Sequence, residues 1–356
     1  MRNVLLELKP NVRPCGKHNL KLPALGMGCW AYGGGEYWGP HSQAEVNRVV
    51  HYAIDRGCNF FDTAEAYNDG ASESSLGRAL KGIAREKVII GTKISPCHTA
   101  PQSLVEHCEA SLRRLQADYV DLYMVHWPIT SPAIRHFSSE NLPIPSVADA
   151  FATLSRLKQQ GKIRHIGVSN FGEAKLQEAL DTGVEIVANE LPYSLLTRGI
   201  EVEMLPFCRA SGIGVIGYMA LMQGVLTNTY RTLADVPQWR RRTRHFDCRR
   251  TLQCRHGLPG AEAETNATLH AVRSLAAQHN MTVSEIALKW TFAQEGIASS
   301  LCGSRTVAQL ESNLKAAAEP LAPGIIDELN RVSTPLLQKL GAGFDYYEHP
   351  DNDRTK

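Results

Sequence analysis

The run Val-Ile-Ile-Gly-Thr-Lys at residues 88–93 decides the fold, because it is a short apolar segment that ends at a chemically useful side chain. Two runs of the same kind flank it, Asn-Phe-Phe-Asp at residues 59–62 and Leu-Tyr-Met-Val-His at residues 122–126. Each is expected to be a β-strand, and in a parallel α/β protein the ends of successive strands converge on one face. We therefore expect Asp62, Lys93 and His126 to share a pocket, together with Tyr67 in the loop after the first run.

Strand-like and helix-like segments alternate along most of the chain. The expected strands lie at residues 24–30, 59–64, 88–94, 119–127, 163–170, 185–192, 214–221 and 298–304. Apolar residues at three- and four-residue spacing predict helices at 43–56, 72–82, 103–115, 147–160, 261–279, 283–294 and 307–318. Eight strands alternating with helices predict an α/β fold, a (β/α)8 TIM barrel with long loops over its C-terminal face. An open doubly wound sheet would require a Gly-x-Gly-x-x-Gly turn after the first strand, and the glycines at 33–35 lack that spacing.

The whole chain, residues 1–356, is interpreted as one barrel domain with a possible N-terminal hairpin at 14–22 that closes one end. Two connections are long, 128–146 and 227–260, and neither shows a periodic pattern. Connections of this length in a compact domain are usually functional lids or disordered segments. The tail at 338–356 is expected to fold back over the barrel mouth.

Composition favours a protein of the cytoplasm. The chain is 43% hydrophobic, yet no segment approaches the 18 or more apolar residues of a membrane span. Residues 1–10 carry an apolar patch that is too short and too charged for a secretory signal. The nine cysteines are scattered and odd in number, which suits a reducing compartment. The sequence does not determine the oligomeric state.

Charge does not favour nucleic acid as a partner. The net charge is +2, and the main basic cluster is the arginine-rich stretch at 240–250. Because nucleic-acid binding requires a broader basic face, this stretch is interpreted as a solvated or partner-facing loop. The alternative is a cap over a cofactor pyrophosphate or an acidic substrate.

The four polar side chains at the strand ends could together donate a proton. A phenol has a reference pKa near 10 and is a poor acid at neutral pH. An ammonium beside it, held by a carboxylate, would favour the phenolate and lower that pKa. An imidazole can hydrogen-bond a substrate oxygen and orient it. These four side chains are suited to protonating a carbonyl oxygen while hydride is transferred to the carbonyl carbon.

Six blocks, in order along the chain, resemble the aldo-keto reductase family. They are Asp-Thr-Ala-Glu-Ala-Tyr (62–67), Gly-Arg-Ala-Leu (77–80), Thr-Lys (92–93), His-Trp-Pro (126–128), Gly-Lys-Ile-Arg-His-Ile-Gly-Val-Ser-Asn-Phe (161–171) and Gly-Ser-Arg-Thr (303–306). The resemblance is strongest to bacterial sugar- and polyol-type members, because of Pro-Tyr-Ser-Leu-Leu-Thr-Arg-Gly-Ile-Glu (192–201) and Phe-Asp-Tyr-Tyr-Glu (344–348). It implies a TIM barrel that uses NADP(H) or NAD(H) to interconvert a carbonyl (aldehyde, ketone or sugar) and an alcohol.

The resemblance also implies a role for each site residue. Tyr67 would be the general acid, Lys93 the partner that tunes its pKa, Asp62 the group that orients Lys93, and His126 the group that positions the carbonyl. The implied cofactor residues are Ser169, Asn170 and Glu190 at the nicotinamide carboxamide, Tyr218 stacked on the nicotinamide, and Ser304, Arg305, Gln309 and Asn313 at the adenosine end.

Ser304 and Arg305 are expected to open the last helix, where unpaired N–H groups favour an anion. A guanidinium binds a 2′-phosphate in bidentate fashion, so we expect NADP(H), with NAD(H) remaining open.

Three positions depart from the family pattern. Glu190 stands where a glutamine usually binds the carboxamide, unless Asn189 takes over by a local shift. Gly303 replaces a common lysine, and Met219 replaces a common serine near the pyrophosphate. The cofactor pocket is therefore expected to be the least typical part of the chain.

The aromatic residues around the first and fourth strand ends have two compatible interpretations, a hydrophobic lid or a platform for a substrate. The expected substrate residues are Trp30, Tyr32, Trp38 and Trp127, with Tyr37 beside them. The loop at 227–260 also carries His245, Cys248, Cys254 and His256. Their spacing matches no common structural zinc site, so we predict no metal.

Two other functions remain open from the sequence. One is a sugar-modifying enzyme of the epimerase or lyase type that retains and internally recycles its NAD(P), suggested by Glu190 and the long loop at 227–260. The other is a non-catalytic regulatory protein like the potassium-channel β-subunits, against which the four catalytic residues argue.

Overall fold

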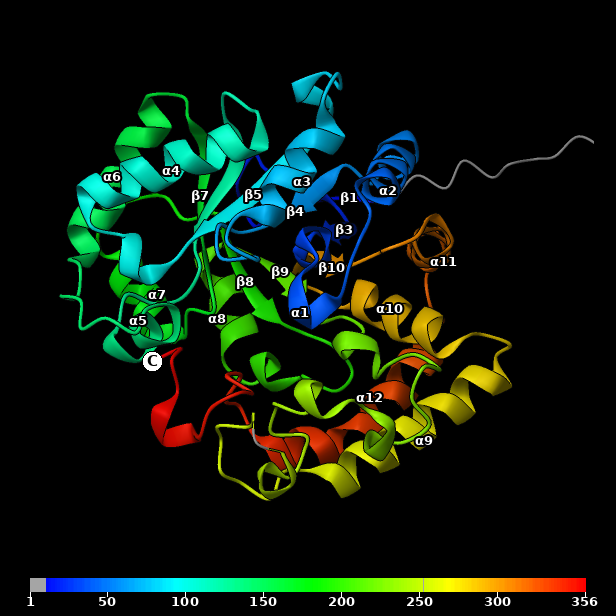
Figure 1. Cartoon of the computed structure of the whole chain (residues 1–356). Helices are drawn as coiled ribbons and strands as arrows, with labels where there is room; N and C mark the ends of the chain where they lie inside the picture. Colours follow the sequence, from blue (N-terminus) through cyan, green and yellow to red (C-terminus); the bar gives the residue numbers. More distant parts are fainter. Residues whose placement is uncertain (1–10, 252) are drawn as a thin grey trace, which may run out of the picture.

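Eight parallel strands close into a barrel in the order β10-β3-β4-β5-β6-β7-β8-β9 (Figure 1). The computed structural model describes residues 11–251 and 253–356, so the N-terminal segment considered as a secretory signal lies outside the described residues. The strands are β3 (Leu25–Gly28), β4 (Phe60–Asp62), β5 (Ile89–Ile94), β6 (Val120–Val125), β7 (Ile163–Ser169), β8 (Ala188–Pro192), β9 (Gly214–Tyr218) and β10 (Ile297–Cys302). The predicted (β/α)8 TIM barrel is confirmed.

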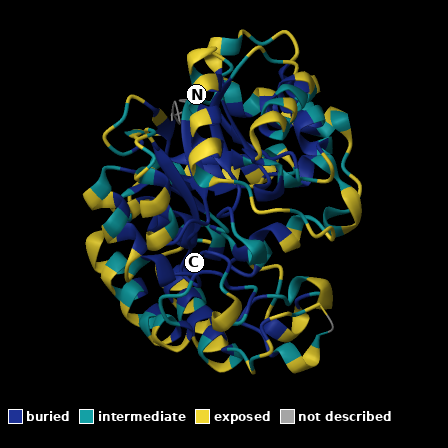
Figure 2. Ribbon diagram, turned by 90° about the vertical axis from the view of Figure 1, so that its left-hand side faces the viewer, coloured by how far each residue is buried: buried dark blue, intermediate teal, exposed yellow. Residues whose placement is uncertain are grey.

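Helices surround the barrel, and several begin where the sequence supplies an N-cap. Ser42, Ser146 and Thr282 each accept a hydrogen bond from the backbone N–H three residues later. The main helices are α2 (Gln43–Asp55), α3 (Ala71–Leu80), α4 (Pro101–Leu115), α6 (Val147–Gln159), α7 (Glu173–Leu180), α8 (Met204–Ser211), α9 (Glu262–Gln278), α10 (Val283–Ala293), α11 (Val307–Ala318) and α12 (Pro323–Leu340). Their buried faces cover the strands and their exposed faces form the outer surface (Figure 2).

The structure corrects the sequence reading of several connections. The segment 128–146 was expected to be irregular, but it contains the short helix α5 (Ser131–Phe137), whose seven residues are too few to display a period. Helices α7 and α8 are also short and were not predicted. Helix α12 was missed as well, because Pro335 lies inside it and interrupts a helical pattern.

A hairpin covers the end of the barrel opposite the site. Strands β1 (Val12–Pro14) and β2 (Lys21–Pro23) pair in antiparallel fashion. Cys15, Leu20 and Leu22 from this segment pack with Phe60 and Leu122 of the barrel interior. The N-terminal ends of the strands are therefore sealed by apolar side chains, and the polar residues collect at the other end.

The loop at 227–260 and the C-terminal tail lie against each other at the C-terminal end of the barrel (Figure 1). The backbone N–H of Arg244 donates to the carbonyl of Tyr346 at 2.7 Å, and its guanidinium donates to the carbonyl of Leu340 at 2.8 Å. Arg354 donates to both oxygens of Asp345, at 2.8 and 2.7 Å, and lies 4.0 Å from the centre of the Trp127 ring. These contacts fix the tail beside the fourth strand end of the site.

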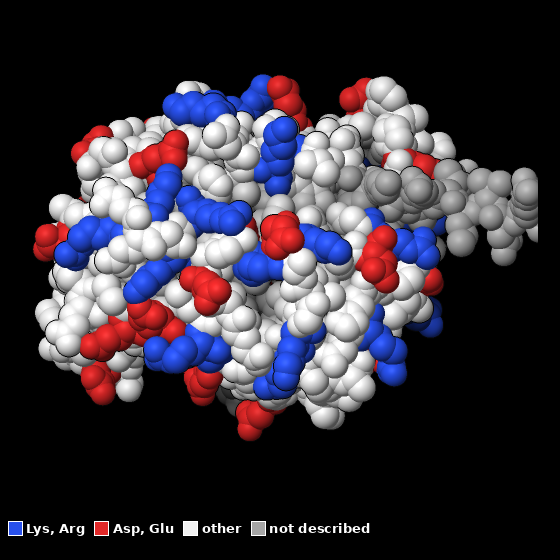
Figure 3. All heavy atoms as spheres, turned by 90° about the horizontal axis from the view of Figure 1, so that it is seen from above, with Lys and Arg blue, Asp and Glu red and all other residues white. Residues whose placement is uncertain are grey.

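The face seen in Figure 3 carries lysine and arginine interspersed with aspartate and glutamate. Among the described residues no helix has the length and apolar character needed to cross a membrane.

Candidate active site

The four predicted catalytic residues meet at the C-terminal ends of three adjacent strands. Asp62 ends β4, Lys93 lies near the end of β5, and His126 follows β6 directly. Lys93 Nζ donates to the two oxygens of Asp62 at 2.7 and 2.6 Å and to Tyr67 Oη at 3.3 Å. The rings of Tyr67 and His126 meet edge to face with centroids 5.7 Å apart. The register Asp62↔Gly91 and Lys93↔Met124 produces this convergence.

Lys93 is fully buried and remains charged because of its partners. Burial alone would lower its pKa, but Asp62, Glu190 and Tyr67 raise it, and the net shift is upward. Lys93 Nζ also lies 3.0 Å from the carbonyl of Thr63, so its three hydrogens have four acceptors within reach. A lysine held in this way is a fixed positive charge beneath the phenol.

Glu190 belongs to this ion network, which the sequence did not predict. Its Oε1 lies 3.3 Å from Lys93 Nζ, and its side chain is 3% exposed. Burial and the neighbouring Asp62 raise the pKa of Glu190 well above its ordinary value, and Lys93 offsets this only in part. Two buried carboxyl groups therefore face one ammonium, and the shorter contact of Asp62 with Lys93 favours Glu190 as the group that holds a proton.

Asn189 does not replace Glu190. It precedes Glu190 on β8, so its side chain points to the opposite face of the sheet. There its amide donates to the carbonyl of Phe171 at 2.8 Å. The local shift considered from the sequence is therefore not seen.

The pKa of Tyr67 is raised, which corrects the expectation that Lys93 would lower it. Burial is the largest cause, Asp62 and Glu190 add to it, and Lys93 acts in the opposite direction. The phenol is thus neutral at physiological pH and available as a proton donor. The role that geometry leaves to Lys93 is to stabilise negative charge on the phenol oxygen once the proton has left.

His126 is a neutral imidazole. Burial and the charge of Lys93 lower its pKa well below the ordinary value. Nδ1 is buried without a hydrogen-bond partner, which favours the tautomer with the proton on Nε2. That nitrogen is then a donor suited to a carbonyl oxygen.

The predicted nicotinamide residues lie together at the ends of β7, β8 and β9. Asn170 donates to Ser169 Oγ at 3.0 Å and to the carbonyl of His126 at 3.1 Å. Tyr218 Oη donates to Asn170 Oδ1 at 2.8 Å, so the phenol ring is fixed beside the pair. Glu190 Oε2 is buried without a hydrogen-bond partner. An unpaired polar atom next to an anchored aromatic ring fits a carboxamide-bearing ring as ligand.

Two of the predicted adenosine residues, Ser304 and Arg305, lie between β10 and α11, and the other two, Gln309 and Asn313, lie within α11. Asn313 donates to Ser304 Oγ at 3.0 Å, and Gln309 accepts from the backbone N–H of Arg305 at 2.8 Å. The Arg305 guanidinium donates to the carbonyls of Trp38 at 2.8 Å and Pro40 at 2.7 Å. Ser304 and Arg305 do not open the last helix as expected, because α11 has Thr306 as its N-cap and α12 follows it.

Three of the five aromatic residues form one group, and the other two lie apart from it. Trp30 lies 5.1 Å from Tyr37, 5.3 Å from Trp38 and 5.7 Å from Tyr67, measured between ring centroids. Tyr32 is buried, with its ring 6.0 Å from that of His41.

Trp127 is buried under Arg354 of the tail. Only the group around Trp30 therefore adjoins the proposed acid.

A second ionisable cluster beside the site was missed by the sequence analysis. Glu65 Oε1 accepts from the backbone N–H of Ser95 at 2.9 Å and contacts His98 Nδ1 at 2.8 Å. Glu65 Oε2 contacts His107 Nδ1 at 2.7 Å, and the two imidazoles stack with centroids 3.7 Å apart. Its histidines are 33 and 42 residues from Glu65, a separation that no spacing rule would flag.

Comparisons with known proteins place the chain in a family. The model of the Aldo/keto reductase family matches residues 24–333. The NADH-specific methylglyoxal reductase of Escherichia coli (strain K12) is 32% identical over 322 residues, which cover 85% of this chain and 92% of that protein.

Two solved structures share the fold. A thermostable aldo-keto reductase in complex with epalrestat has a TM-score of 0.70 and 27% identity, over 90% of this chain and 99% of that one. An aldo/keto reductase from Klebsiella pneumoniae in complex with NADP and acetate has a TM-score of 0.67 and 24% identity, over 90% of this chain and 95% of that one.

Proposed function

The chain belongs to the aldo/keto reductase family, and from this premise we propose that it reduces the carbonyl of an aldehyde, ketone or sugar with Tyr67 as the general acid. At the level of the family, the prediction of a nicotinamide-dependent enzyme that interconverts carbonyl and alcohol is confirmed. The observation that carries the residue roles is the contact of 3.3 Å between Lys93 Nζ and Tyr67 Oη. It places a buried, charge-compensated ammonium directly against the phenol.

The dinucleotide supplies hydride when bound, and the side chains of this chain manage the proton. Tyr67 donates its hydroxyl proton to the carbonyl oxygen, and Lys93 stabilises the phenolate that remains. Asp62 holds Lys93 in position through both carboxylate oxygens. His126, neutral and protonated on Nε2, donates a hydrogen bond that orients the same carbonyl oxygen. In the direction of alcohol oxidation each transfer runs in reverse.

The residues present fit a nicotinamide dinucleotide. Tyr218 offers a ring anchored through Asn170, and Glu190 offers an unpaired oxygen. In its protonated form Glu190 has one O–H donor and one carbonyl acceptor, so it can replace both functions of an amide side chain. This property explains how a glutamate can stand where the family usually has a glutamine.

The proposed preference is for NADP(H), and it rests on Arg305. Its guanidinium is oriented by the carbonyls of Trp38 and Pro40 at the start of α11, where a phosphate would meet a fixed cation. The NADH-specific relative makes NADH the necessary comparison. Arg305→Ala should weaken NADPH binding by about tenfold or more, as for the loss of a charge-assisted hydrogen bond, and leave NADH unchanged. Equal losses for both cofactors would contradict the assignment.

The proposed substrate is a small carbonyl compound or sugar that packs on the group around Trp30. That indole lies beside the acid, and aromatic faces bind apolar ring surfaces. Methylglyoxal belongs in the first panel because of the similar enzyme, together with other aldehydes, ketoses and aldoses. The comparisons lend no support to internal cofactor recycling or to a non-catalytic channel subunit.

The decisive test is Tyr67→Phe, assayed by NADPH and NADH consumption at 340 nm. Turnover should fall by about 10²- to 10⁴-fold, the usual contribution of a general acid, while cofactor still binds. Tyr52→Phe serves as the control, since Tyr52 lies on the outer helix α2 and bonds Glu311. Turnover by Tyr67→Phe within a few-fold of the unmodified enzyme would refute the role of Tyr67.

A further inference from the structure

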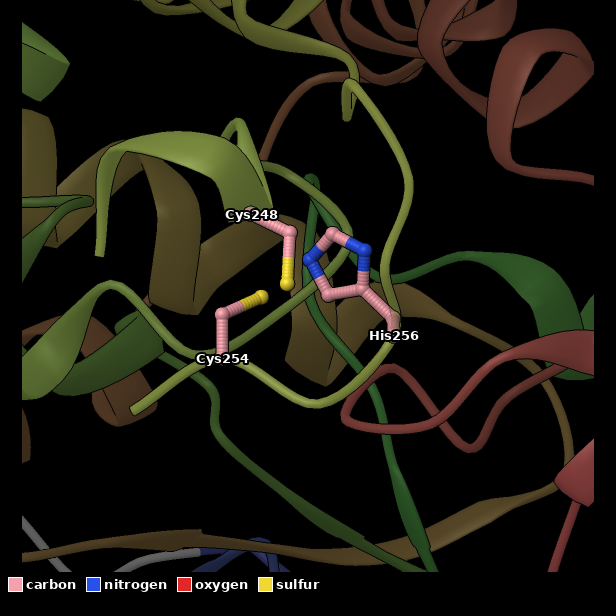
Figure 4. A group of neighbouring side chains, drawn as sticks. All are labelled: Cys248, Cys254 and His256. Carbon is pink, nitrogen blue, oxygen red and sulfur yellow. The ribbon is translucent and has the colours of Figure 1, made fainter. Parts of the chain in front are cut away.

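The loop at 227–260 brings three metal-binding side chains together. The two sulfur atoms of Cys248 and Cys254 and a ring nitrogen of His256 all lie within 4.8 Å of one another (Figure 4). The fourth residue of the sequence pattern, His245, is not part of the group. Its Nε2 contacts the carbonyl of Leu196 at 2.6 Å, and its Nδ1 contacts Thr243 Oγ1 at 3.1 Å. Without His245, the candidate metal ligands are a compact set of three residues rather than four residues at an unfamiliar sequence spacing.

The imidazole of His256 has an unused nitrogen that points at the two sulfurs. Its Nδ1 accepts from the backbone N–H of Leu258 at 3.1 Å. Its Nε2 is buried without a hydrogen-bond partner, and the residue has no exposed surface. Figure 4 shows that the ring nitrogen remote from the Cβ attachment faces both sulfur atoms. A buried ring nitrogen without a partner is costly, and a ligand between it and the sulfurs would remove that cost.

The two sulfur atoms have different hydrogen-bond partners, since Cys254 Sγ donates to the carbonyl of Arg242 at 3.9 Å and Cys248 Sγ is an acceptor. The backbone N–H of Gly257 donates to Cys248 Sγ at 3.2 Å. Burial and the neighbouring Cys248 raise the pKa of Cys254 to about 12, while the backbone N–H groups of His256 and Arg255 lower it. Such N–H groups stabilise a thiolate, the form in which cysteine binds a metal. Among the cysteines of the described residues, these two are the only partly exposed ones, so an ion can reach them.

We propose that Cys248, Cys254 and His256 form a zinc site with three protein ligands and one open position. Thiolate and imidazole together are the ligands that Zn²⁺ prefers, and three protein ligands with water in fourth place is an established arrangement. Ideal Zn–S bonds of about 2.3 Å put two tetrahedral sulfurs about 3.8 Å apart. Because the three ligand atoms lie within 4.8 Å of one another, closure around the ion requires the sulfurs to approach by at most about 1 Å.

Proton balance makes the affinity depend on pH. Zinc binding to two thiols releases two protons to solvent, and the imidazole proton moves from Nε2 to Nδ1. The contact between Nδ1 and the N–H of Leu258 opens as a result. The zinc complex of two thiolates and one neutral imidazole carries no net charge, which suits a loop crowded with arginines. Affinity should fall as the pH is lowered, because protons compete for both sulfurs.

The site would link the loop to the barrel mouth. Arg242, which precedes the three ligands in the loop, packs with its guanidinium 4.7 Å from the ring centre of Tyr37, in the aromatic group around Trp30. Arg255, which lies between the two later ligands, pairs with Glu348 of the tail at 2.7 Å. An ion that holds Cys248 to Cys254 and His256 would thus fix the arginine-rich segment over the C-terminal end of the barrel.

The chain contains an internal comparison in the cluster of Glu65, His98 and His107. There both carboxylate oxygens and both Nδ1 atoms are already engaged with one another. None of its three residues carries sulfur, but Cys97 is hydrogen-bonded to His98, so the two clusters are distinguished by which variant loses the cobalt band. The variant His107→Gln tests whether the cluster of Glu65, His98 and His107 binds the ion, because it leaves the loop at 227–260 unchanged.

The experiment is a titration of the reduced full-length protein, freed of metal with a chelator, with Zn²⁺ and separately with Co²⁺. We expect one equivalent of each ion, an ultraviolet thiolate-to-cobalt charge-transfer band, and a higher Tm with zinc. Cys254→Ser should lose about 100-fold or more in zinc affinity together with the band, whereas His107→Gln and Cys208→Ser should retain both. Cobalt binding without the sulfur band, or full affinity in Cys254→Ser, would overturn the proposal. So would a Cys248–Cys254 disulfide in zinc-free protein kept under reducing conditions.

Discussion

The ion network beneath Tyr67 has two carboxyl groups for one ammonium, and this imbalance predicts how Asp62→Asn and Glu190→Gln combine. Asp62 contacts Lys93 Nζ at 2.6 Å and Glu190 does so at 3.3 Å, all of them buried. In Asp62→Asn, Glu190 loses its proton and becomes the counterion. At an effective dielectric constant of 20 the pair energies are about 6.4 and 5.0 kcal/mol, so the exchange costs about 1.4 kcal/mol.

The second single variant should be close to neutral. Glu190 is already uncharged in the folded protein, because burial and Asp62 raise its pKa well above the ordinary value. Glu190→Gln therefore replaces one neutral side chain by another of the same shape, at a cost of about 0.5 kcal/mol. The double variant leaves Lys93 buried without any carboxylate, and removing the partner of a buried charge costs about 3–5 kcal/mol. The coupling free energy is then about 2 kcal/mol.

The measurement is a double-mutant cycle from urea unfolding at pH 7. Tryptophan fluorescence and far-ultraviolet circular dichroism should give coincident transitions, which justifies a two-state free energy. Asp121→Asn combined with Asp62→Asn is the control, since Asp121 lies at the opposite end of β6 and pairs with Arg85. Losses that add within about 0.5 kcal/mol in the test cycle would refute the shared counterion.

Three further outcomes follow from other parts of the structure. Hydrogen bonds to Cys97 and Glu65 raise the pKa of His98 to about 10. The contribution of His98 to the free energy of unfolding is therefore complete below about pH 6.5 and is lost as the pH rises through 10. Urea unfolding from pH 6 to 10 should show this loss of stability, and His98→Gln should reduce the pH dependence. Asp345→Asn should destabilise the tail by about 1.5–3 kcal/mol, because Arg354 loses its charge-assisted hydrogen bonds to Asp345 and keeps only Glu348, whose Oε1 lies 4.0 Å from Arg354 Nε. Hydrogen exchange should become faster in the tail and stay unchanged in the strands, and uniform protection would contradict this. Tyr218→Phe should weaken NADPH binding only a few-fold, since the ring stays while one hydrogen bond of about 1 kcal/mol is lost; an isothermal titration measures it, and a hundredfold loss would show a different role.

The strands were predictable because a buried parallel strand can be recognised from a short run of apolar residues. The segment at 88–93 is a short apolar run that ends at Lys93. The bounds of β5 in the structure differ from it by one residue at each end. The catalytic positions follow from the same logic, since strand ends converge on one face. Neither inference depended on knowing how a side chain turns or what it touches.

The connections were less predictable, because their structure depends on distant contacts. Helix α5 contains only seven residues and lies within a segment rich in proline. The tail is held by Arg354, which pairs with Asp345 and covers Trp127. Nothing in the sequence around Trp127 shows that a guanidinium from the far end of the chain covers it. The substrate role predicted for Trp127 was therefore assigned to a side chain that the tail buries.

The direction of the Tyr67 pKa was wrong for a similar reason. From the sequence, one ammonium beside one phenol should lower the pKa. The structure adds burial and two carboxyl groups, and together these outweigh Lys93. Charge counting along a chain cannot include desolvation, which depends on everything packed around the group.

Glu190 therefore belongs to the proton-transfer machinery as much as to the proposed cofactor pocket. Its Oε1 lies 3.3 Å from Lys93 Nζ, its Oε2 is unpaired, and its ionised form would raise the pKa of Tyr67. Ionisation of Glu190 would remove the O–H donor proposed for the carboxamide and, at the same time, oppose the phenolate that Tyr67 must become. A glutamine at this position would do neither. The departure from the family pattern at residue 190 thus joins the ion network of Lys93 to the proposed carboxamide site, and both proposed roles require that Glu190 hold a proton.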